Sequence, residues 1–527
     1  SVVLYKQEGC RVNEILPQEA EFLLTSILQT NTELPGKPIM KNAVSGKNVI
    51  VVGAGIGGLS AGILLSLFGY NVTVLEKNPV PGGLMRSYGR AGVDCPVGVH
   101  YVGALGEREP LGILFRAMGV SVDDLFSPMG EQGVIDRYIF DDFVFDLPAS
   151  LDDYEKNLRS AFPRDRSCID RIIANLREVA GRFADISFFT GGSDPFQNMD
   201  FYLSLGEMLE QAGASAGLRS VLAVPCNLIG VPLGDCPVIF HHMILASYLF
   251  SSWKLKEGGR AMTEAFVRRL HETGGRLLLN SDVRGISVAQ SKVAGVMLAS
   301  GERLPADIII FAAHPKLLLG LLEENALRES YRRRLRSVQE TQSVLGVQVA
   351  VDAKRHPLLP HNIYRMETDE KGDIQKGVFY QLHSTQDSAT HLLSMITKSL
   401  YEDWALWDHT LTGCRGSAYE DRKMLLARQL LEDARQVLGD LEDARILDVY
   451  TPLTIRDYVN APEGSCYGVM RSSRQLLRTI ALNNVPVGGL YLAGQNALAP
   501  GVMGCVLGSF NVARQILGAD KFAEIVG

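Results

Sequence analysis

The sequence predicts an α/β fold with a Rossmann-like part, joined to a second part of mixed α and β structure. Three observations support this prediction. A strand–turn–helix–strand pattern occupies residues 47–76, an apolar strand pattern lies at 306–312, and a third strand pattern at 490–493 precedes a glycine turn and a helix. Such alternation is typical of parallel sheets covered by helices. Because these pieces lie far apart in the chain, we expect the Rossmann-like part to be built from interleaved segments.

The first segment carries a glycine-rich turn between a strand and a helix. Residues 47–83 read KNVIVVGAGIGGLSAGILLSLFGYNVTVLEKNPVPGG. We expect a strand at 48–52, the turn at 53–58, a helix at about 59–68 and a second strand at 71–75. The turn matches G-x-G-x-x-G in the strand–turn–helix setting that binds dinucleotides.

The residues of this motif have separate physical tasks. Gly53 permits the tight turn, Gly55 lets a pyrophosphate approach the backbone, and Gly58 lets the helix pack closely on the strand. Free N–H groups at the start of the helix, where Gly57 lies, attract phosphate. Glu76, at the end of the second strand, can accept hydrogen bonds from a ribose hydroxyl. The segment therefore predicts a dinucleotide site and leaves FAD and NAD as alternatives.

Composition and charge narrow the classes of function. Hydrophobic residues make up 46% and charged residues 21% of the 527 residues, which is the range of globular proteins with an ample core. The net charge of −7 argues against binding of nucleic acid. The eight cysteines form no C-x-x-C pair, so the sequence indicates neither a zinc site nor a redox dithiol. We predict no metal ligands.

The sequence predicts neither a membrane span nor a signal peptide. No run of 18 apolar residues is present, and the N-terminus lacks a basic and then apolar pattern. We therefore expect a cytoplasmic protein. Peripheral contact with a membrane needs no spanning segment and stays open, as does the oligomeric state.

Further helices and strands are predicted between these segments. Helical periodicity over 151–183 is interrupted at Pro163, and another helix is expected near 420–438. Residues 256–315 predict a helix, two strands, a hairpin and a strand. Ahead of the glycine turn, we expect a short amphipathic helix at 18–28 and then a linker with the sequence LPGKP.

Four stretches together resemble one known family. They are PGG at 81–83, GVHYVG at 98–103, TPLTIRDYVNAPEGSCYG at 451–468 and LYLAGQNALAPGVMG at 490–504. With the glycine turn, they resemble the phytoene desaturase superfamily, and within it the branch of retinol saturase and carotenoid isomerase. The resemblance spans about 47–520. It implies a two-domain flavoprotein of the amine-oxidase/phytoene-desaturase type that binds FAD.

The resemblance also implies how the chain is divided. Residues 1–46 form an N-terminal extension that lies outside it. The FAD-binding domain is expected from 47–125, 255–315 and 485–527, and the substrate-binding domain from 126–254 and 316–484.

The expected cofactor residues follow from the matched motifs. Val283 lies where the family holds adenine through backbone hydrogen bonds, and the helix that opens at Gly501 would direct its N-terminus at the flavin ring. A helix N-terminus there stabilises negative charge on reduced flavin. Besides the glycines of the turn, the expected cofactor residues are Glu76, Lys77, Gly82, Gly83, Arg86, Val283, Gly494, Gln495, Gly501, Val502 and Met503.

His100 and Tyr101, in the stretch HYVG, are the predicted catalytic residues. The resemblance places them beside the flavin ring, where a histidine can move a proton or shape the pocket. A packed, hydrogen-bonded histidine is the alternative for His100. The roles of two other stretches also have alternatives. The apolar stretch 240–253 is either cavity lining or a core helix, and the basic stretch 329–338 is a solvated helix face, a membrane-facing patch or a site for the phosphate of NADPH.

The resemblance implies an FAD-dependent oxidoreductase that acts on a conjugated polyene or another long hydrophobic substrate by hydride transfer at flavin N5. Double-bond reduction, desaturation and isomerisation all fit. Reductive cyclisation in polyene natural-product biosynthesis fits as well, because the central motif reads Gly258-Gly259-Arg260 rather than GGM. No second G-x-G-x-x-G is present, so NADPH would act as an external reductant. The alternatives are an amine-oxidase-like flavoenzyme for a small polar substrate and a non-catalytic FAD-binding protein of the escort type.

Overall fold

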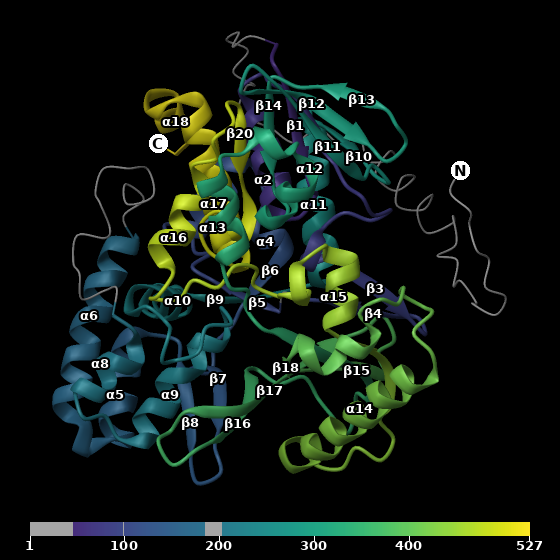
Figure 1. The fold of residues 1–527 in the computed structure, drawn as a ribbon. Helices are drawn as coiled ribbons and strands as arrows, with labels where there is room; N and C mark the ends of the chain where they lie inside the picture. The colour runs from purple at the N-terminus through teal and green to yellow at the C-terminus, as the bar shows by residue number, and fades with distance from the viewer. Residues whose placement is uncertain (1–45, 99, 185–202, 527) are drawn as a thin grey trace.

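A five-stranded parallel sheet in the order β10-β2-β1-β14-β20 forms the centre of the first part of the molecule (Figure 1). The computed structural model describes residues 46–98, 100–184 and 203–526. The sheet joins strands from near the start, the middle and the end of the chain, which confirms the predicted interleaving. Its strands are Arg276–Leu278 (β10), Asn71–Leu75 (β2), Asn48–Val52 (β1), Ile308–Phe311 (β14) and Leu490–Leu492 (β20).

Three helices pack together against one face of this sheet. α2 (Ile56–Leu67) contacts both α11 (Gly258–Glu272) and α17 (Gly501–Leu517). Almost every residue of α2 is buried, as is typical of a helix that is apolar on all sides. The helix begins at Ile56 rather than near Leu59, because the last glycines of the motif already form its first turn.

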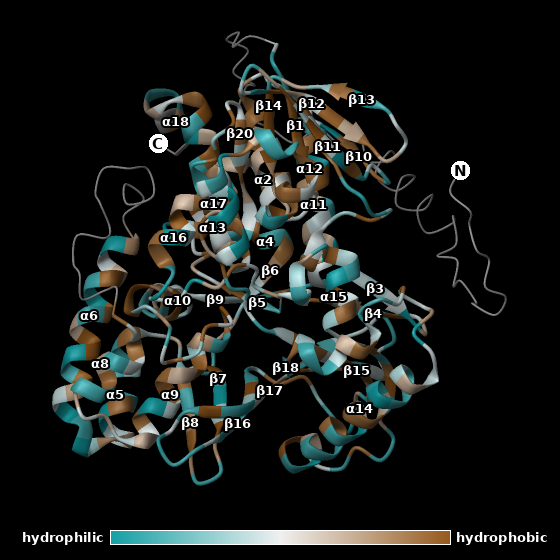
Figure 2. Cartoon of the chain, in the orientation of Figure 1, coloured by the Kyte–Doolittle hydropathy of each residue, from teal (hydrophilic) through white to brown (hydrophobic). Residues whose placement is uncertain are grey.

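A three-stranded antiparallel sheet, β11-β12-β13, covers the other face. Ile286 and Val296 of this sheet pack with Ile50 and Ile309 of the parallel sheet in one hydrophobic cluster. Figure 2 shows hydrophobic residues concentrated in these strands. The central strands are thus buried on both faces, as parallel strands usually are. The antiparallel strands are Val283–Ala289 (β11), Lys292–Leu298 (β12) and Arg303–Pro305 (β13).

A seven-stranded mixed sheet organises the second part of the molecule. One hydrophobic cluster joins it to α14 (Ser417–Leu438) around the fully buried Trp404. In the order of the sheet, the strands are Arg445–Tyr450 (β19), Ser343–Asp352 (β15), Thr390–Ser399 (β18), Ile374–Ser384 (β17), Asn362–Thr368 (β16), Val134–Ile139 (β7) and Val144–Pro148 (β8).

A group of helices lies beside β7 and β8 at the lower left of Figure 1. The first two are separated by a short 3-10 turn at Pro163–Asp165, which confirms the predicted interruption at Pro163. Proline has no N–H to donate and favours such a break. The helices are Leu151–Ala161 (α5), Arg166–Ala184 (α6), Leu205–Gln211 (α8), Ala216–Asn227 (α9) and Val238–Phe250 (α10).

A small antiparallel sheet connects the two parts (Figure 1). It consists of β5 (Tyr101–Gly103), β9 (Ser252–Leu255) and β6 (Phe126–Pro128). β5 therefore places the HYVG stretch at the junction. The remaining elements include the hairpin Ser87–Arg90 (β3) and Val93–Pro96 (β4), and the helices Pro110–Met118 (α3), Val122–Leu125 (α4), Leu318–Leu321 (α12), Glu329–Ser337 (α13), Pro452–Val459 (α15), Leu476–Ile480 (α16) and Ala519–Val526 (α18).

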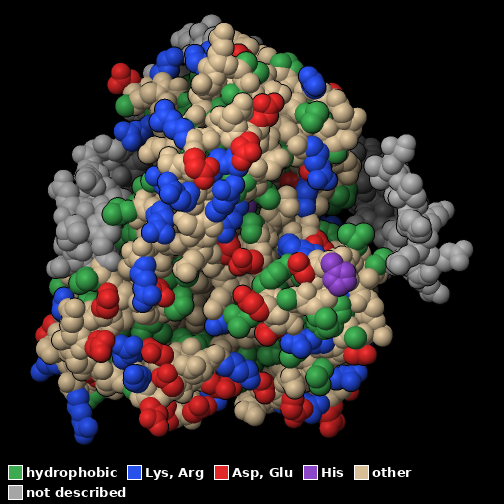
Figure 3. Space-filling model, viewed as in Figure 1, with side chains coloured by type: hydrophobic (Ala, Val, Ile, Leu, Met, Phe, Trp, Pro, Cys, Tyr) green, Lys and Arg blue, Asp and Glu red, His purple; other side chains and the backbone are tan. Residues whose placement is uncertain are grey.

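The basic stretch predicted at 329–338 forms α13 and part of the surface. Lys and Arg side chains gather in Figure 3 over the region where Figure 1 shows α13 and α16. Arg332 is buried and forms ion pairs with Glu324 and Glu329, whereas Arg333 and Arg336 are exposed. The stretch therefore combines one buried, ion-paired arginine with exposed arginines, and this exposure fits each of the three predicted roles.

Two further predictions concern the ends of the chain and the membrane. The helix at 18–28 and the linker after it lie outside the described residues. Within the described ranges, no helix combines the length and the apolar character needed to cross a bilayer.

Candidate functional site

A large cavity lies where the two parts of the molecule meet. Its volume is about 900 Å³. Residues at the carboxyl ends of β1, β2 and β14 line one end, and residues of α10, β16 and β17 line another. Open α/β sheets bind their ligands at the carboxyl ends of parallel strands, so the position is that of a ligand site. The size is within the range of small-molecule and cofactor sites.

The glycine-rich turn forms one wall of the cavity. Gly53 adopts a φ of +102°, which favours glycine. A Cβ on Gly58 would lie 2.0 Å from the carbonyl oxygen of Gly53, and one on Gly57 would lie 2.4 Å from Cα of Gly494. By contrast, a Cβ on Gly55 would meet no atom of the described residues within 4 Å. The backbone at Gly55 is therefore open to the cavity, as a phosphate group lying against the turn requires.

Glu76 is held in place at the end of β2. Its Oε2 accepts a hydrogen bond from the N–H of Ala54 at 3.0 Å. Its Oε1 accepts from the backbone N–H of Asn78 at 2.9 Å and from the Asn78 side-chain amide at 2.8 Å. The side chain is buried but lines the cavity. A carboxylate fixed at this strand end suits the hydroxyls of a ribose.

Gly82 and Gly83 form a second turn that lies directly on the first. The N–H of Gly82 donates to the carbonyl of Ala54 at 2.8 Å. A Cβ on Gly82 would lie 2.7 Å from Oγ1 of Thr263, and one on Gly83 would lie 3.3 Å from Cα of Gly55. The two turns therefore present a continuous surface of backbone, without side chains, to the cavity.

Arg86 and Lys77, which follow Gly83 and Glu76 closely in the chain, line the same end of the cavity with cationic side chains. Arg86 donates from Nε to the carbonyl of Gly83 and from Nη2 to the carbonyl of Tyr458, both at 2.9 Å. Lys77 donates from Nζ to the carbonyl of Asp457 at 2.6 Å. Burial lowers the pKa of both side chains. Positive charge beside the glycine turns favours a phosphate-containing ligand.

Residues 490–504 form the last wall of the nucleotide end of the cavity, which we call the cradle. Gly494, with a φ of +75°, lies against α2, and α17 begins at Gly501 beside the cavity. Oγ of Ser509 donates to the carbonyl of Gly57 at 2.6 Å, which ties α17 to α2. The first N–H groups of a helix have no partner within the helix. The start of α17 is thus a place where negative charge on a ligand is stabilised.

The structure brings almost all of the predicted site residues to this cavity. Gly58 does not line it, because this residue packs behind the turn on Gly53. It shapes the turn rather than contacting a ligand. The predicted residues that do line the cavity are Gly53, Gly55, Gly57, Glu76, Lys77, Gly82, Gly83, Arg86, His100, Tyr101, Val283, Gly494, Gln495, Gly501, Val502 and Met503.

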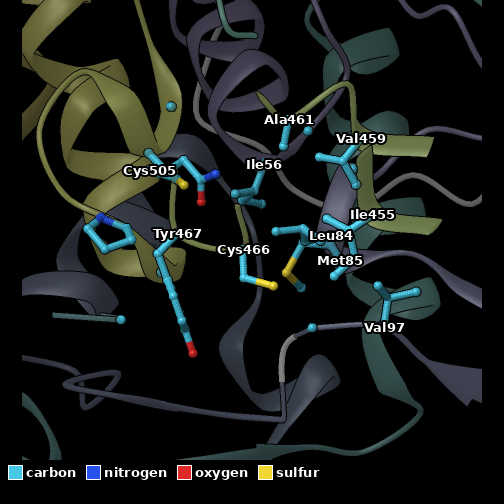
Figure 4. Close-up of a pocket in the computed structure, with 18 of the residues that line it drawn as sticks. Ile56, Leu84, Met85, Val97, Ile455, Val459, Ala461, Cys466, Tyr467 and Cys505 are labelled. Carbon is cyan, nitrogen blue, oxygen red and sulfur yellow. The ribbon is translucent and has the colours of Figure 1, made fainter. Parts of the chain in front are cut away.

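Much of the remaining wall is apolar. Figure 4 shows Ile455, Val459 and Ala461 close to Leu84 and Met85, all with side chains at the cavity. Elsewhere apolar and aromatic side chains from α10, β16 and β17 predominate, and Ser247 and Gln375 of these elements add polar groups. The apolar and aromatic side chains are Ile244, Tyr248, Tyr364, Met366 and Phe379. The cradle therefore opens directly into a chamber suited to a hydrophobic molecule.

His100 lies at the edge of this chamber. Its Nδ1 lies 3.1 Å from Oε1 of Gln381, whose Nε2 donates to Oδ1 of Asn362 at 2.8 Å. This arrangement makes Nδ1 the protonated nitrogen and leaves Nε2 buried, with no partner among the described residues. Burial lowers the pKa of His100 to about 4, so the ring is neutral at pH 7. The structure favours a packed histidine that also lines the cavity.

Tyr101 belongs to a buried polar cluster beneath the chamber. Its hydroxyl donates to Oδ2 of Asp136 at 2.9 Å and lies 2.9 Å from the hydroxyl of Tyr364. Oδ1 of Asp136 accepts from Nδ2 of Asn362 at 2.8 Å. Asp136 is 1% exposed, and burial raises its pKa to about 7. This carboxyl therefore exchanges a proton near neutral pH.

No motif in the sequence marks Asp136, Asn362, Tyr364 or Gln381. They lie on β7, β16 and β17, and the sheet register brings them together, since Asn362 pairs with Asp136. The one sequence signal for Asp136 is the stretch VIDRYI at 134–139, in which this acid follows two apolar residues within a short strand pattern. A fully buried acid is rare unless it is paired.

α10 combines the two roles predicted as alternatives for 240–253. His241 and His242 are fully buried in the core, with their Nδ1 atoms 2.9 Å apart. Nε2 of His241 donates to the carbonyl of Leu222 at 3.0 Å. Ile244 and Tyr248 of the same helix line the cavity. The helix is therefore both core and cavity wall.

We expect the protein to lose stability in mild acid because several histidines are buried and form no ion pair with a carboxylate of the described residues. Burial lowers the pKa of His100 and His241 to about 4 and that of His383 to about 3, and it also lowers the pKa of His242. The unfolded chain, with ordinary histidine pKa values near 6.5, takes up protons first. The stabilisation is fully present above pH 6.5 and is lost as the pH falls toward 4.

Differential scanning fluorimetry between pH 7.5 and pH 5 tests this prediction. We expect the melting temperature to fall by roughly 5 °C or more. Asp136 acts in the opposite sense, because its raised pKa removes stability as the pH rises toward 7. Burial also raises the pKa of Glu264, so two carboxyls oppose the four histidines. A melting temperature that is constant or higher at pH 5 would contradict the prediction.

The fold and the cavity define a class of protein: an α/β dinucleotide-binding protein whose cradle opens into an apolar chamber. The open space at Gly55 and the backbone surface formed with Gly82 and Gly83 fit the pyrophosphate of FAD. The chain belongs to the family of flavin containing amine oxidoreductases, whose family model matches residues 56–517. It is an FAD-dependent enzyme, as predicted.

Curated relatives and solved structures agree with this assignment. The all-trans-retinol 13,14-reductase of Danio rerio is 24% identical, and the match covers 90% of this chain and 87% of the relative. The chloroplastic prolycopene isomerase of Daucus carota is 22% identical, with 98% and 88% covered. These two relatives confirm the resemblance to the retinol saturase and carotenoid isomerase branch. The structure of cyclohexylamine oxidase from Brevibacterium oxydans matches with a TM-score of 0.59 at 18% identity, covering 91% of this chain and 99% of that protein, which shows a common fold.

Proposed function

We propose that this enzyme reduces one carbon–carbon double bond of a conjugated polyene, or of a similar long hydrophobic substrate, and that NADPH supplies the electrons from outside. The observation that carries the proposal is the continuity of the cavity: a cradle suited to FAD opens, without a separating wall, into an apolar chamber. The curated relatives whose names include retinol reductase and prolycopene isomerase support a polyene as substrate.

The chamber fits a small polar amine less well. Among the described residues that line the cavity, the acidic side chains are Glu76 and Asp282. Glu76 is hydrogen-bonded to the glycine turn, and Asp282 forms an ion pair with Arg284 at 2.7 Å. Both lie at the nucleotide end. An ammonium group in the apolar chamber would therefore have no carboxylate lining it as a partner.

The protein's own groups have three tasks in this proposal. Bound FAD, once reduced, supplies hydride equivalents to the substrate. The glycine turns, Glu76, Lys77 and Arg86 hold the dinucleotide, and the start of α17 stabilises negative charge on the flavin ring. The apolar walls hold the polyene and exclude water. We also propose that the FAD-binding part comprises 47–125, 255–315 and 485–527, and that 126–254 and 316–484 bind the substrate.

Anaerobic absorbance spectroscopy of the holoenzyme tests the direction of the reaction. NADPH should bleach the flavin band, and a conjugated polyene added afterwards should restore it as the substrate is reduced. If the oxidised flavin is instead bleached by the polyene alone, the enzyme is a desaturase. If NADPH-reduced flavin persists while the polyene changes only its geometry, the enzyme is an isomerase. Either result would overturn the proposed reduction, and a ring-closed product would show the reductive cyclisation.

A further inference from the structure

We propose that Asp136 stores a proton, which passes through Tyr101 and Tyr364 to the substrate carbon. This inference rests on the proposed function, because saturation of a double bond needs a proton as well as a hydride equivalent. The carboxyl lies behind the cavity wall, while both tyrosines line the cavity. The three groups form a continuous series of hydrogen bonds, with 2.9 Å from Asp136 to Tyr101 and 2.9 Å from Tyr101 to Tyr364.

The remaining contacts of Asp136 fix which oxygen holds the proton. Oδ1 accepts from Nδ2 of Asn362, and this amide is oriented in turn by Gln381 and His100. Oδ1 is therefore an acceptor in both protonation states. As a carboxylate, Asp136 accepts the Tyr101 hydroxyl proton at Oδ2, and in the neutral carboxyl the proton lies on Oδ2 and this hydrogen bond is reversed. In the neutral state the hydrogen bonds then run from the carboxyl through Tyr101 to Tyr364 at the cavity.

The surroundings allow the carboxyl to be neutral at physiological pH. Burial is the main cause that raises its pKa to about 7. The groups that face it from the neighbouring elements are neutral: Tyr138 of β7, Tyr248 of α10, and the tyrosines and amide already named. The pKa values of Tyr138 and Tyr248 are raised, so both remain protonated. Among the described residues, no lysine or arginine forms an ion pair with Asp136.

The transfer balances without a charged tyrosine. The O–H bond of Asp136 breaks as its proton binds the oxygen of Tyr101, whose own proton moves to Tyr364. The proton of Tyr364 forms the new C–H bond at the carbon next to the one that takes up the hydride equivalent from reduced FAD. Asp136 ends as a carboxylate, and both tyrosines end neutral with reversed hydrogen bonds. Water then returns a proton to Asp136 before the next turnover.

Infrared difference spectroscopy of the substrate-free holoenzyme tests the stored proton. The wild-type protein should show a protonated carboxyl band at pH 6 that disappears by about pH 8, and Asp136→Asn should lack it. Asp146→Asn is the matched control: Asp146 lies on the neighbouring strand and forms an ion pair with Arg137 away from the cavity, at 2.8 Å. This control should retain the band. Absence of the band in the wild type at pH 6 would overturn the proposal.

Stopped-flow reoxidation of the reduced enzyme by a polyene tests the delivery. In the wild type, the rate should fall as the pH rises through about 7. Asp136→Asn and Tyr364→Phe should lower the rate at pH 6 by about 100-fold, and Asp136→Asn should remove this pH dependence. Asp136→Glu should retain part of the rate at pH 6 and part of the pH dependence. If Asp136→Asn reduces the polyene at the wild-type rate and with the wild-type pH dependence, the proton transfer from Asp136 is overturned, while the proposed function stands. An enzyme that shows the infrared band but reduces no polyene would overturn the proposed function and, with it, the delivery step.

Discussion

Replacement of Gly55 by valine should give a folded protein that no longer retains FAD. In the part of the chain that the structure describes, a Cβ at Gly55 meets no atom within 4 Å, and the backbone, with φ −71° and ψ 173°, suits any residue. The fold should therefore accept the new side chain. The added methyl groups would occupy the space in which the pyrophosphate approaches the turn. We expect the affinity for FAD to fall by at least about 100-fold, which corresponds to about 3 kcal/mol.

Flavin absorbance per chain and isothermal titration calorimetry measure this loss. The matched control is Gly89→Val, since Gly89 is an exposed glycine of β3 whose Cβ position also has no atom of the described ranges within 4 Å. The control should purify with full FAD content, and both apoproteins should melt at the wild-type temperature. Yellow Gly55→Val protein with wild-type affinity would show that the cofactor does not lie on this turn.

A second large effect, on catalysis of polyene reduction, is expected from a bulky substitution in the apolar wall of the cavity. Ile244 lies half-buried on α10 and lines the chamber. Tryptophan at this position would extend into the space that we assign to the polyene. We expect Ile244→Trp to lower kcat/KM for a long polyene by about 100-fold or more while the FAD content stays at the wild-type level. Local overpacking should cost about 1–3 kcal/mol of stability.

Leu425→Trp is the control for the added tryptophan, because Leu425 is 57% exposed on α14 and does not line the cavity. Steady-state kinetics with polyenes of two lengths separate blocked space from general damage. The shorter substrate should lose less activity than the longer one in Ile244→Trp. Equal losses for both lengths, or a loss of FAD, would contradict the assignment of the chamber.

The nucleotide end of the site could be predicted from sequence because backbone groups of short glycine turns form most of its surface. Gly53, Gly55 and Glu76 lie at fixed offsets around one strand–turn–helix unit, so local spacing determines their geometry. The main difference from the prediction is that α2 begins at Ile56 instead of about residue 59, because the last glycines of the motif belong to the helix. Gly58 was placed correctly in the turn but does not face the cavity.

The substrate end could be predicted only in part. His100 and Tyr101 stood out in the HYVG stretch, but their partners did not, because Asp136, Tyr364 and Gln381 meet through the register of a seven-stranded sheet. Register between strands more than 200 residues apart leaves no local pattern. The two roles of α10 also needed the structure, since burial of His241 and exposure of Ile244 to the cavity depend on how the helix is rotated.

Mass and absorbance of the reaction product test the central claim most directly. The holoenzyme is reduced with NADPH under anaerobic conditions and mixed with a conjugated polyene alcohol, and the product is analysed by liquid chromatography with mass spectrometry. We predict a product heavier by two hydrogens that absorbs at a shorter wavelength, because one double bond has left the conjugated system. A product of unchanged mass, or one lighter by two hydrogens, would contradict the claim that this enzyme reduces a polyene.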